Sequence, residues 1–261
     1  MIISKKITLL SFALYSFCIS LPDAKAAYHY YLDDKSQQEI NTVLKNKSHS
    51  IEEISKQFLN TPYQSDTLIG SSTQPEKMVV NLNAVDCFTF IDYVLALSLS
   101  NNVDAFIENL IRVRYIDGTI SFYNRKHFFS DWYYIAPKNA EEITKKISPN
   151  SITVFKRLNE KPDGTEYLAG IGAIPRNINY IPSSYVNEAV ISKLKTGDFI
   201  GIYTNQVGLD ASHVGILIKK GNQVYFRNAS SLKKNRKVVD SPFLEYIKNK
   251  PGIMVLRTQQ N

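Results

Sequence analysis

The stretch NLNAVDCFTFIDYVLAL, residues 81–97, places a cysteine between a polar segment and an apolar run. The polar segment, residues 81–86, is rich in turn-forming residues and predicts a loop. The residues from Cys87 to Ser98 are apolar nearly all round a helix, which predicts a helix buried in the core. Cys87 would then lie at the helix start, where free backbone N–H groups and the helix dipole favour a thiolate. We therefore expect a lowered pKa and a nucleophilic thiol, with a buried, inert thiol as the alternative.

The first 26 residues have the pattern of a secretory signal peptide. Two lysines precede an apolar stretch at residues 7–21, and Ala24-Lys25-Ala26 is an A-x-A cleavage pattern. The apolar stretch is short for a membrane span. We therefore expect cleavage after Ala26 and a bacterial protein that is exported, periplasmic or secreted, with no stable membrane anchor. An uncleaved anchor is the alternative.

Cleavage would leave Cys87 as the sole cysteine of the mature chain, because Cys18 leaves with the signal. In an oxidising compartment a lone cysteine is buried, paired with another molecule, or reactive. Cleavage also removes three lysines and one aspartate, which lowers the net charge from +7 to +5. Only residues 233–237 form a dense basic cluster, so we expect no nucleic-acid partner. The cluster itself predicts a solvated loop, or attraction to an anionic envelope polymer.

Periodicity along the chain changes from helical to strand-like. Apolar spacing and capping-box patterns that begin at Ser36 and Ser50 predict two N-terminal helices at residues 36–45 and 51–59. Further helices are expected at 103–111, 139–147 and 184–194, and Asp117-Gly118 predicts a hairpin. Short β-rich runs predict antiparallel strands at residues 198–204, 212–218, 223–229 and 252–258. This order indicates an α+β class, with a single domain over residues 27–261 that includes a helical extension at 27–59.

A base for the thiol can be sought among the histidines. His213 begins an apolar strand, and a tight turn at residues 219–222 leads into the next strand. A hairpin centred on that turn brings His213 opposite Asn228, within hydrogen-bonding reach of its side chain. A one-residue shift of register would put the two on opposite faces. If the register holds, Asn228 orients His213 and His213 activates Cys87, as in a Cys-His-Asn triad.

These residues resemble a known family. TPYQSDTL (residues 61–68) followed by VDCFTFIDYVLAL (85–97) is similar to the NlpC-type cell-wall cysteine peptidases, and most similar to the N-acetylmuramoyl-L-alanine amidase-like branch. RYIDG (114–118), YNRKHFFSDW (123–132) and GDFIGIYTNQVGLDASHVGIL (197–217) also fit that branch. The matches run from about residue 55 to 256 and keep the family order.

The resemblance implies a papain-like fold, in which a helix that carries the cysteine packs on an antiparallel sheet that carries the histidine. It implies hydrolysis of an amide bond in a peptidoglycan stem peptide, with Cys87 as nucleophile and His213 as base. Asn228 stands where some relatives have histidine, which is a departure from the family pattern. Tyr63 corresponds to the tyrosine beside the catalytic cysteine, and its O–H is a candidate oxyanion donor together with the Cys87 backbone N–H.

Residues 123–132 have two interpretations. In the structural one, the aromatic side chains anchor a loop and Arg125 forms a salt bridge with Asp131. In the functional one, this loop forms a substrate wall with Arg125 for a carboxylate, Asp131 for an ammonium, Trp132 for stacking and His127 for a hydrogen bond. His127 is also the rival base, and Asp86 is a further candidate substrate contact.

The sequence therefore predicts an exported cysteine hydrolase that cleaves peptidoglycan, an amidase or endopeptidase. Alternatives are a papain-like acyltransferase and an inactive cell-wall module that only binds muropeptides. One cysteine and histidines without metal-site spacing give no reason to expect a metal or cofactor. The sequence leaves the oligomeric state open.

Overall fold

The computed structural model describes residues 30–45 and 50–258, so the expected signal peptide lies outside the described residues. The α-helices are α1 (Asp34–Lys45), α2 (Ile51–Gln57), α3 (Cys87–Ser98), α4 (Val103–Arg114), α5 (Asp131–Tyr134), α6 (Thr144–Ile147), α7 (Glu188–Lys193) and α8 (Phe243–Ile247). The strands are β1 (Tyr30–Leu32), β2 (Met78–Val80), β3 (Glu141–Glu142), β4 (Ile152–Leu158), β5 (Ile174–Pro182), β6 (Phe199–Tyr203), β7 (Ala211–Lys220), β8 (Gln223–Ser230), β9 (Lys237–Pro242) and β10 (Gly252–Arg257). Short 3-10 turns lie at Ile116–Gly118, Phe122–Asn124 and Ser183–Tyr185.

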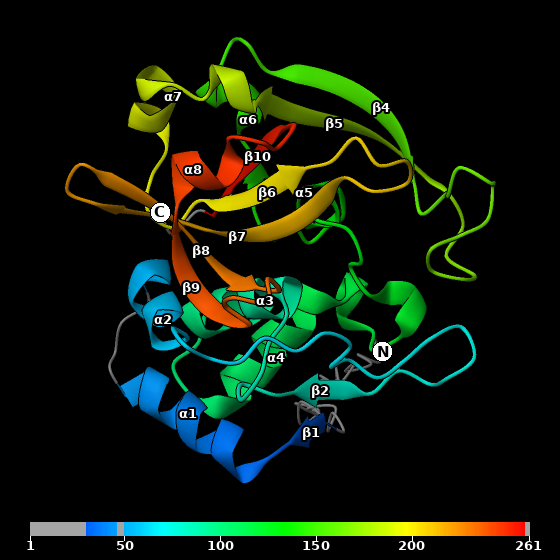
Figure 1. Cartoon of the computed structure of the whole chain (residues 1–261). Coiled ribbons are helices and arrows are strands. Elements are labelled where there is room, and N and C mark those ends of the chain that lie inside the picture. Colours follow the sequence, from blue (N-terminus) through cyan, green and yellow to red (C-terminus); the bar gives the residue numbers. More distant parts are fainter. Residues whose placement is uncertain (1–29, 46–49, 259–261) are drawn as a thin grey trace, which may run out of the picture.

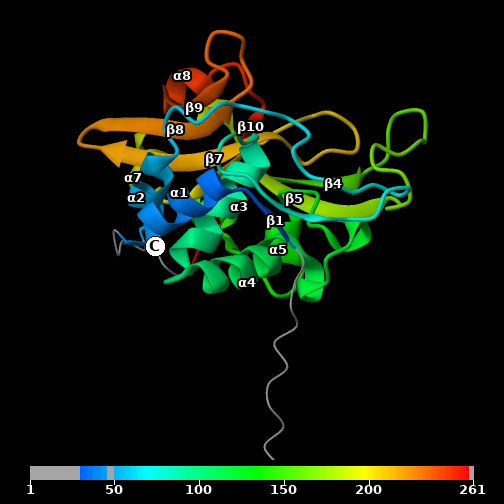
Figure 2. The same ribbon diagram turned by 90° about the horizontal axis from the view of Figure 1, so that it is seen from below.

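An eight-stranded antiparallel sheet forms the centre of the protein, in the order β4-β5-β10-β6-β7-β8-β9 with β3 beside β10. A separate pair, β1 and β2, is parallel. Figures 1 and 2 show α3 and α4 on one side of the β7–β9 region and α8 on the other. The structure is thus a mixed α/β protein in which the expected antiparallel sheet is present.

The two faces of the sheet bury two different hydrophobic clusters. Along β10, Met254 and Leu256 pack in the cluster of α3 and α4, whereas Ile253 and Val255 pack in the cluster of α6, α7 and α8. This alternation is the period of two that a strand buried on both faces imposes. It explains why β6, β7 and β10 are nearly continuous apolar runs that were recognisable in the sequence.

Several of the predicted elements are confirmed. Helix α3 has the expected bounds, and α1, α2 and α4 agree with their predictions within a few residues. The four predicted strands correspond to β6, β7, β8 and β10. No helix within residues 30–45 and 50–258 is long and apolar enough to span a membrane.

Three local predictions are wrong. Asp117-Gly118 does not join two strands, because α4 continues to Arg114 and a 3-10 turn follows. The helix expected at residues 139–147 is reduced to α6, with β3 in front of it. The capping residue of α1 is not Ser36: the Asp33 carboxylate accepts hydrogen bonds from the Ser36 N–H and hydroxyl groups, and Ser36 is fully buried within the helix.

Candidate active site

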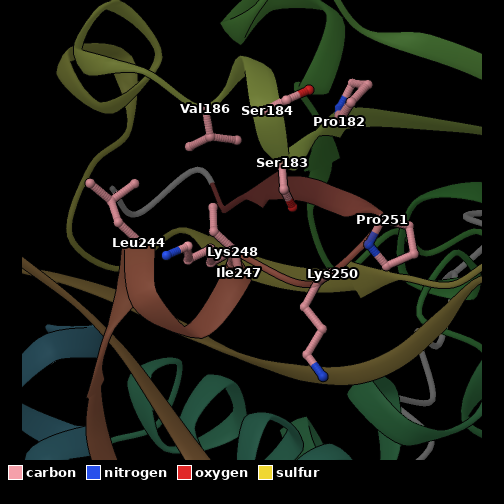
Figure 3. A pocket seen from close by; sticks show the side chains of 9 residues that line it. All are labelled: Pro182, Ser183, Ser184, Val186, Leu244, Ile247, Lys248, Lys250 and Pro251. Carbon is pink, nitrogen blue, oxygen red and sulfur yellow. The ribbon is translucent and has the colours of Figure 1, made fainter.

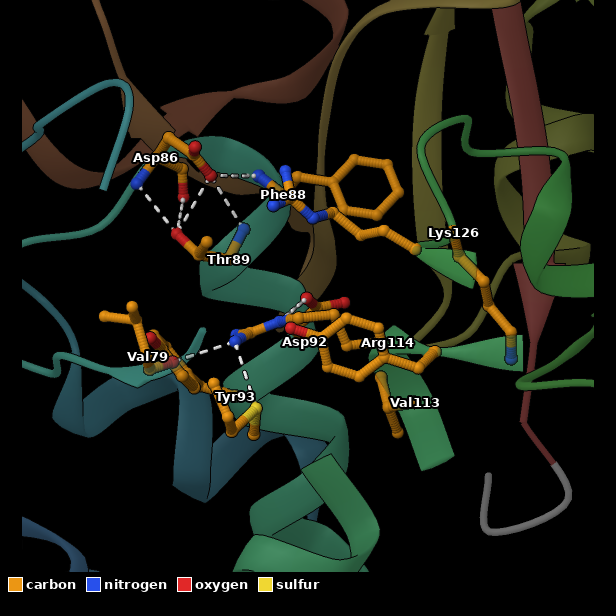
Figure 4. Close-up of polar contacts among 12 residues, drawn as sticks. Val79, Asp86, Phe88, Thr89, Asp92, Tyr93, Val113, Arg114 and Lys126 are labelled. Atoms are coloured by element: carbon orange, nitrogen blue, oxygen red, sulfur yellow. Dashed lines mark hydrogen bonds and ion pairs between the residues drawn. The ribbon is translucent and has the colours of Figure 1, made fainter. Parts of the chain in front are cut away.

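Cys87 is the first residue of α3, as the sequence predicts. Asp86 is the N-cap and forms a complete capping box: its carboxylate accepts from the Phe88 and Thr89 N–H groups, and the Thr89 hydroxyl accepts from the Asp86 N–H (Figure 4). This geometry fixes where the helix begins. Cys87 is a free cysteine that is half-buried as a residue, and its thiol is the buried part.

The capping role also bears on the expected substrate contact of Asp86. Its Oδ1 atom is already the acceptor for two backbone N–H groups and for the Thr89 hydroxyl. The role of Asp86 as helix cap therefore explains why an aspartate stands at this position, and contact with substrate stays a prediction.

His213 lies on β7 and Asn228 on β8, and their side chains meet. The distance between His213 Nε2 and Asn228 Oδ1 is 3.0 Å. The register differs from the predicted one, because Lys220 pairs with Gln223 and the two-residue turn is Gly221-Asn222. Extension of this register puts Gly215 opposite Asn228, so His213 is its diagonal neighbour. The shift is two residues, an even number, which keeps both side chains on the same face.

The hydrogen bonds of Asn228 determine the tautomer of His213. Asn228 is fully buried, and its Nδ2 donates to the Phe226 carbonyl at 2.9 Å and to the Ser241 hydroxyl at 3.3 Å. The amide oxygen therefore faces the imidazole, and an oxygen can only accept. His213 Nε2 must carry the proton, which leaves Nδ1 as a lone-pair acceptor for a thiol proton.

Aromatic rings enclose the imidazole on the α8 side. The ring of Tyr246 stacks near that of His213, with centroids 6.2 Å apart and an interplanar angle of 28°. Phe226 meets the imidazole edge-on at 5.9 Å. Burial lowers the pKa of His213 below its usual value, and the positive charge of Lys250 acts in the same direction, against the hydrogen bond to Asn228. The imidazole is therefore neutral at pH 7.

The expected low pKa of Cys87 is not what the structure indicates. Burial raises the pKa of the Cys87 thiol to about 12, and the negative charge of Asp86 adds to this effect. The backbone N–H groups of Val214, on β7, and of Cys87 and Phe88, at the helix start, act in the opposite direction. They do not overcome the loss of hydration, because desolvation of a charged sulfur is the larger effect here. The resting site therefore holds a neutral thiol and a neutral imidazole.

The contact with Val214 also locates the thiol relative to the sheet. The β7–β8 ladder extends only to the pair Ile216 and Arg227. Beyond that pair, the N–H of Val214 is directed at the sulfur of Cys87. Cys87 from α3 thus lies against β7 one residue from His213.

Tyr63 also lies near the thiol. Its electrostatic interaction with Cys87 contributes to a raised tyrosine pKa, after burial as the main cause. The Tyr63 backbone pairs with Val85, two residues before Cys87, and its N–H donates to the Arg236 carbonyl at 2.9 Å. The guanidinium of Arg236 lies 4.8 Å above the Tyr63 ring. The basic loop at residues 233–237 is therefore adjacent to the site.

The predicted salt bridge between Arg125 and Asp131 is wrong. Arg125 instead pairs with the buried Glu76, through Nε to Oε1 at 3.1 Å and through a second contact from Nη2 to Oε2. Asp131 is 2% exposed and pairs with Arg176 at 2.8 Å. Both charges are therefore compensated within the protein, which argues against the predicted contacts with a substrate carboxylate and ammonium.

The side chains of Trp132 and His127 are also held by contacts within the protein. Trp132 is fully buried and packs edge-on against Phe199 at 5.0 Å, so it is a core residue and is not exposed for ligand stacking. His127 has a ring nitrogen 2.7 Å from the Phe122 carbonyl, and burial lowers its pKa to about 4. The hydrogen bond to an orienting amide belongs to His213, which makes His213 the better candidate for the base.

Sequence reasoning missed three residues near the site: Tyr246, Lys250 and Arg236. Tyr246 lies on α8 and Lys250 follows it, in a segment with no recognisable motif, whereas Arg236 lies before β9 in the basic cluster at residues 233–237, which gave no sign of contact with the site. Their contacts with His213 and Tyr63 are tertiary, and no spacing rule in the sequence signals them.

These elements define a mixed α/β protein with a cysteine at a helix start and a histidine–asparagine pair on an antiparallel sheet. The sequence pattern of the AmiA-like, N-acetylmuramoyl-L-alanine amidase-like family matches residues 53–253. The chain therefore belongs to this family, which supports a hydrolase of the amidase type with a peptidoglycan-related substrate.

Two solved structures are similar over most of their length. A protein from Legionella pneumophila str. Philadelphia 1 has a TM-score of 0.72 at 24% identity, over 86% of this chain and 94% of its own, which shows the shared fold. An N-acetylmuramoyl-L-alanine amidase from Bacteroides uniformis ATCC 8492 has a TM-score of 0.66 at 29% identity, over 80% of this chain and 99% of its own. The comparison with curated proteins gave no match.

Proposed function

We propose that this protein is an exported cysteine amidase with a papain-like fold that cleaves an amide bond in peptidoglycan stem peptides. The observation that carries the proposal is the His213–Asn228 hydrogen bond on the strand against which the Cys87 thiol lies. It leaves the other imidazole nitrogen as the acceptor for a thiol proton. The family description favours the amide that joins N-acetylmuramic acid to L-alanine.

The neutral resting pair favours general-base catalysis over a preformed ion pair. As Cys87 Sγ attacks the carbonyl carbon, its proton passes to His213 Nδ1 and an S–C bond forms. The oxyanion accepts from the Cys87 backbone N–H and the Tyr63 hydroxyl. Collapse of the intermediate breaks the C–N bond, and His213 returns the proton to the leaving amine. Water then hydrolyses the thioester, with His213 as base, and restores the thiol.

A non-catalytic muropeptide-binding module is the second candidate. The observation that favours it is the raised pKa of Cys87, because a neutral thiol is a weak nucleophile until a base removes its proton. An acyltransferase would share the thioester and differ only in the acceptor that replaces water.

The test is incubation of the protein lacking residues 1–26 with purified sacculi and with muropeptides, followed by mass spectrometry of new amines. Cys87→Ala is the matched control, because alanine removes only the sulfur at the helix start. Product from the parent protein alone supports the amidase. Equal product from both proteins would remove Cys87 as nucleophile. Binding without product supports the module, and transfer to an added amine supports the acyltransferase.

A further inference from the structure

Tyr246 is a half-buried tyrosine on α8 whose ring contacts the candidate base. The ring stacks on the His213 imidazole, with centroids 6.2 Å apart and 28° between the two planes. This distance lies within the range of favourable aromatic pairs, roughly 4.5–7 Å. The same ring packs against Phe226 at 4.9 Å, and Phe226 itself meets the imidazole edge-on. The imidazole therefore has one stacked and one edge-on aromatic neighbour.

The short helix and its surroundings hold the Tyr246 ring in this place. Phe243 and Ile247, four residues apart on α8, are buried in the hydrophobic cluster on this face of the sheet and anchor the helix. Lys250, just after α8, points away from Ser183 (Figure 3). Its ammonium lies 5.9 Å from the centroid of the Tyr246 ring, which adds a cation–π contact.

The hydrogen bond to Asn228 does not fix the imidazole of His213 completely. It holds Nε2 at one point, whereas rotation of a histidine ring about its Cβ–Cγ bond is soft. That rotation changes the direction of Nδ1, the nitrogen that would accept the proton of Cys87. A ring stacked on the imidazole opposes the rotation, because the imidazole plane would have to turn into Tyr246.

Tyr246 also lies near the candidate nucleophile. Burial raises the pKa of Tyr246 to about 12, and the negative charge of Cys87 adds to this effect. The tyrosine hydroxyl is therefore protonated at pH 7, and the ring presents a neutral surface to the imidazole. Cys87 from α3, His213 from β7 and Tyr246 from α8 thus come together at one place.

We propose that Tyr246 is a positioning residue, whose ring holds the plane of the His213 imidazole so that Nδ1 is directed at the Cys87 sulfur. This inference rests on the proposed function and adds to it a residue that acts through the base. The aromatic face performs the role and the hydroxyl does not, so phenylalanine should replace tyrosine at this position.

The experiment compares Tyr246→Phe, which keeps the ring, with Tyr246→Leu, which removes it. Tyr225→Leu is the matched control, because Tyr225 on β8 is also half-buried and also has a lysine ammonium near its ring, at 5.3 Å. We expect Tyr246→Leu to lower kcat for muropeptides about two- to tenfold, the range for one aromatic pair, with little change in KM. Tyr246→Phe and Tyr225→Leu should retain kcat. An equal loss in Tyr246→Phe would assign the role to the hydroxyl, and an equal loss in Tyr225→Leu would show a general effect of aromatic packing; either result would overturn the proposal.

The pH profile distinguishes positioning of the base from a structural effect. Without the Tyr246 ring, water reaches the imidazole, so the pKa of His213 should rise toward 6.5. The acid limb of kcat/KM should therefore move upward in Tyr246→Leu and stay in place in Tyr246→Phe. A lower kcat with an unmoved acid limb would contradict contact of the ring with the base. The titratable and charged groups around the imidazole come from the start of α3 and from α8 and the residues after it: Asp86, Cys87, Tyr246 and Lys250.

NMR of the Cys87→Ala protein separates this inference from the proposed function. A nuclear Overhauser effect between the ring protons of Tyr246 and His213 needs neither substrate nor a change at Tyr246, and we expect to observe it. If no variant hydrolyses muropeptides, but the effect is present and the pKa of the His213 ring resonances rises in Tyr246→Leu, the positioning role stands and the amidase proposal fails. If hydrolysis depends on Cys87 but the effect is absent, or Tyr246→Leu has the parent kcat, the positioning role is wrong.

Discussion

His213 Nε2 lies 3.0 Å from Asn228 Oδ1, although the two residues are diagonal rather than opposite neighbours in the β7–β8 hairpin. The β7–β8 ladder ends at the pair Ile216 and Arg227, before it reaches these two residues. The Asn228 Nδ2 group donates to the Phe226 carbonyl, so the amide oxygen faces the imidazole ring. The hydrogen bond fixes the imidazole as the tautomer that can accept a thiol proton.

Replacement of Asn228 by alanine should lower kcat roughly tenfold, the value of one ordinary hydrogen bond, because the imidazole loses its fixed tautomer. KM should change little, since the substitution acts on the base. Steady-state hydrolysis of muropeptides checks this prediction. Ser241→Ala is the control, because it removes a second partner of Asn228 and leaves the bond to His213 in place. An equal loss of kcat in both variants would indicate a structural effect.

Alkylation of Cys87 should be slow at neutral pH. Burial raises the thiol pKa to about 12, compared with ~8.5 for an unperturbed cysteine. The reactive thiolate is therefore scarce, and its lower fraction at pH 8 should make iodoacetamide react roughly a thousandfold more slowly than with free cysteine. The rate should keep rising above pH 10. A plateau below pH 8.5 would show a stabilised thiolate and contradict the neutral resting pair. The alkylation rate of the Cys87→Ser variant measures reaction of iodoacetamide with other residues and is subtracted.

The acid limb of kcat/KM should have its midpoint below pH 6.5. His213 must be neutral to accept the thiol proton, and burial together with Lys250 lowers its pKa from 6.5. Activity is therefore retained at pH 7 and lost as the pH falls through the lowered value. Lys250→Met should move the midpoint upward, because it removes a positive charge, whereas Asp86 acts in the opposite direction. A midpoint at pH 7 or above would contradict a buried neutral base.

The parts of the fold that could be predicted are those with strong periodicity. Helix α3 is apolar nearly all round, and β6, β7 and β10 are buried on both faces, so composition alone distinguishes them. Strands β4 and β5 were missed because they form an edge pair whose burial alternates and whose sequences contain lysine, arginine, asparagine and proline. Such strands lack a continuous apolar run, and they are defined by pairing: β4 pairs with β5, and β5 also pairs with β10.

The candidate site, like the fold, has residues that the local sequence predicts and residues whose roles depend on distant parts of the chain. Cys87 follows from a local helix start and Asn228 from a hairpin count, both short-range arguments. Arg125 and Asp131 were misjudged because their partners, Glu76 and Arg176, lie 49 and 45 residues away. A local motif shows that a charge is present, but its partner decides whether the charge binds substrate or stabilises the core. Desolvation of Cys87 is likewise a tertiary effect that helix position could not reveal.

The buried pair Arg114–Asp92 should control the stability of the helix that carries Cys87. Arg114 Nε lies 3.0 Å from Asp92 Oδ2 and its Nη1 donates to the Val79 carbonyl at 2.8 Å, with both side chains almost fully buried (Figure 4). Arg114→Met leaves the Asp92 carboxylate uncompensated and should lower the free energy of unfolding, measured with urea at pH 8, by about 3–5 kcal/mol.

Burial raises the pKa of Asp92 to about 6. A raised carboxyl pKa favours the folded state at low pH, so the deficit should shrink at pH 5, where Asp92 is protonated. The double variant with Asp92→Leu should recover most of the loss. A deficit that is equal at pH 5 and pH 8, and unrelieved in the double variant, would mean that lost packing rather than an unpaired charge destabilises the protein.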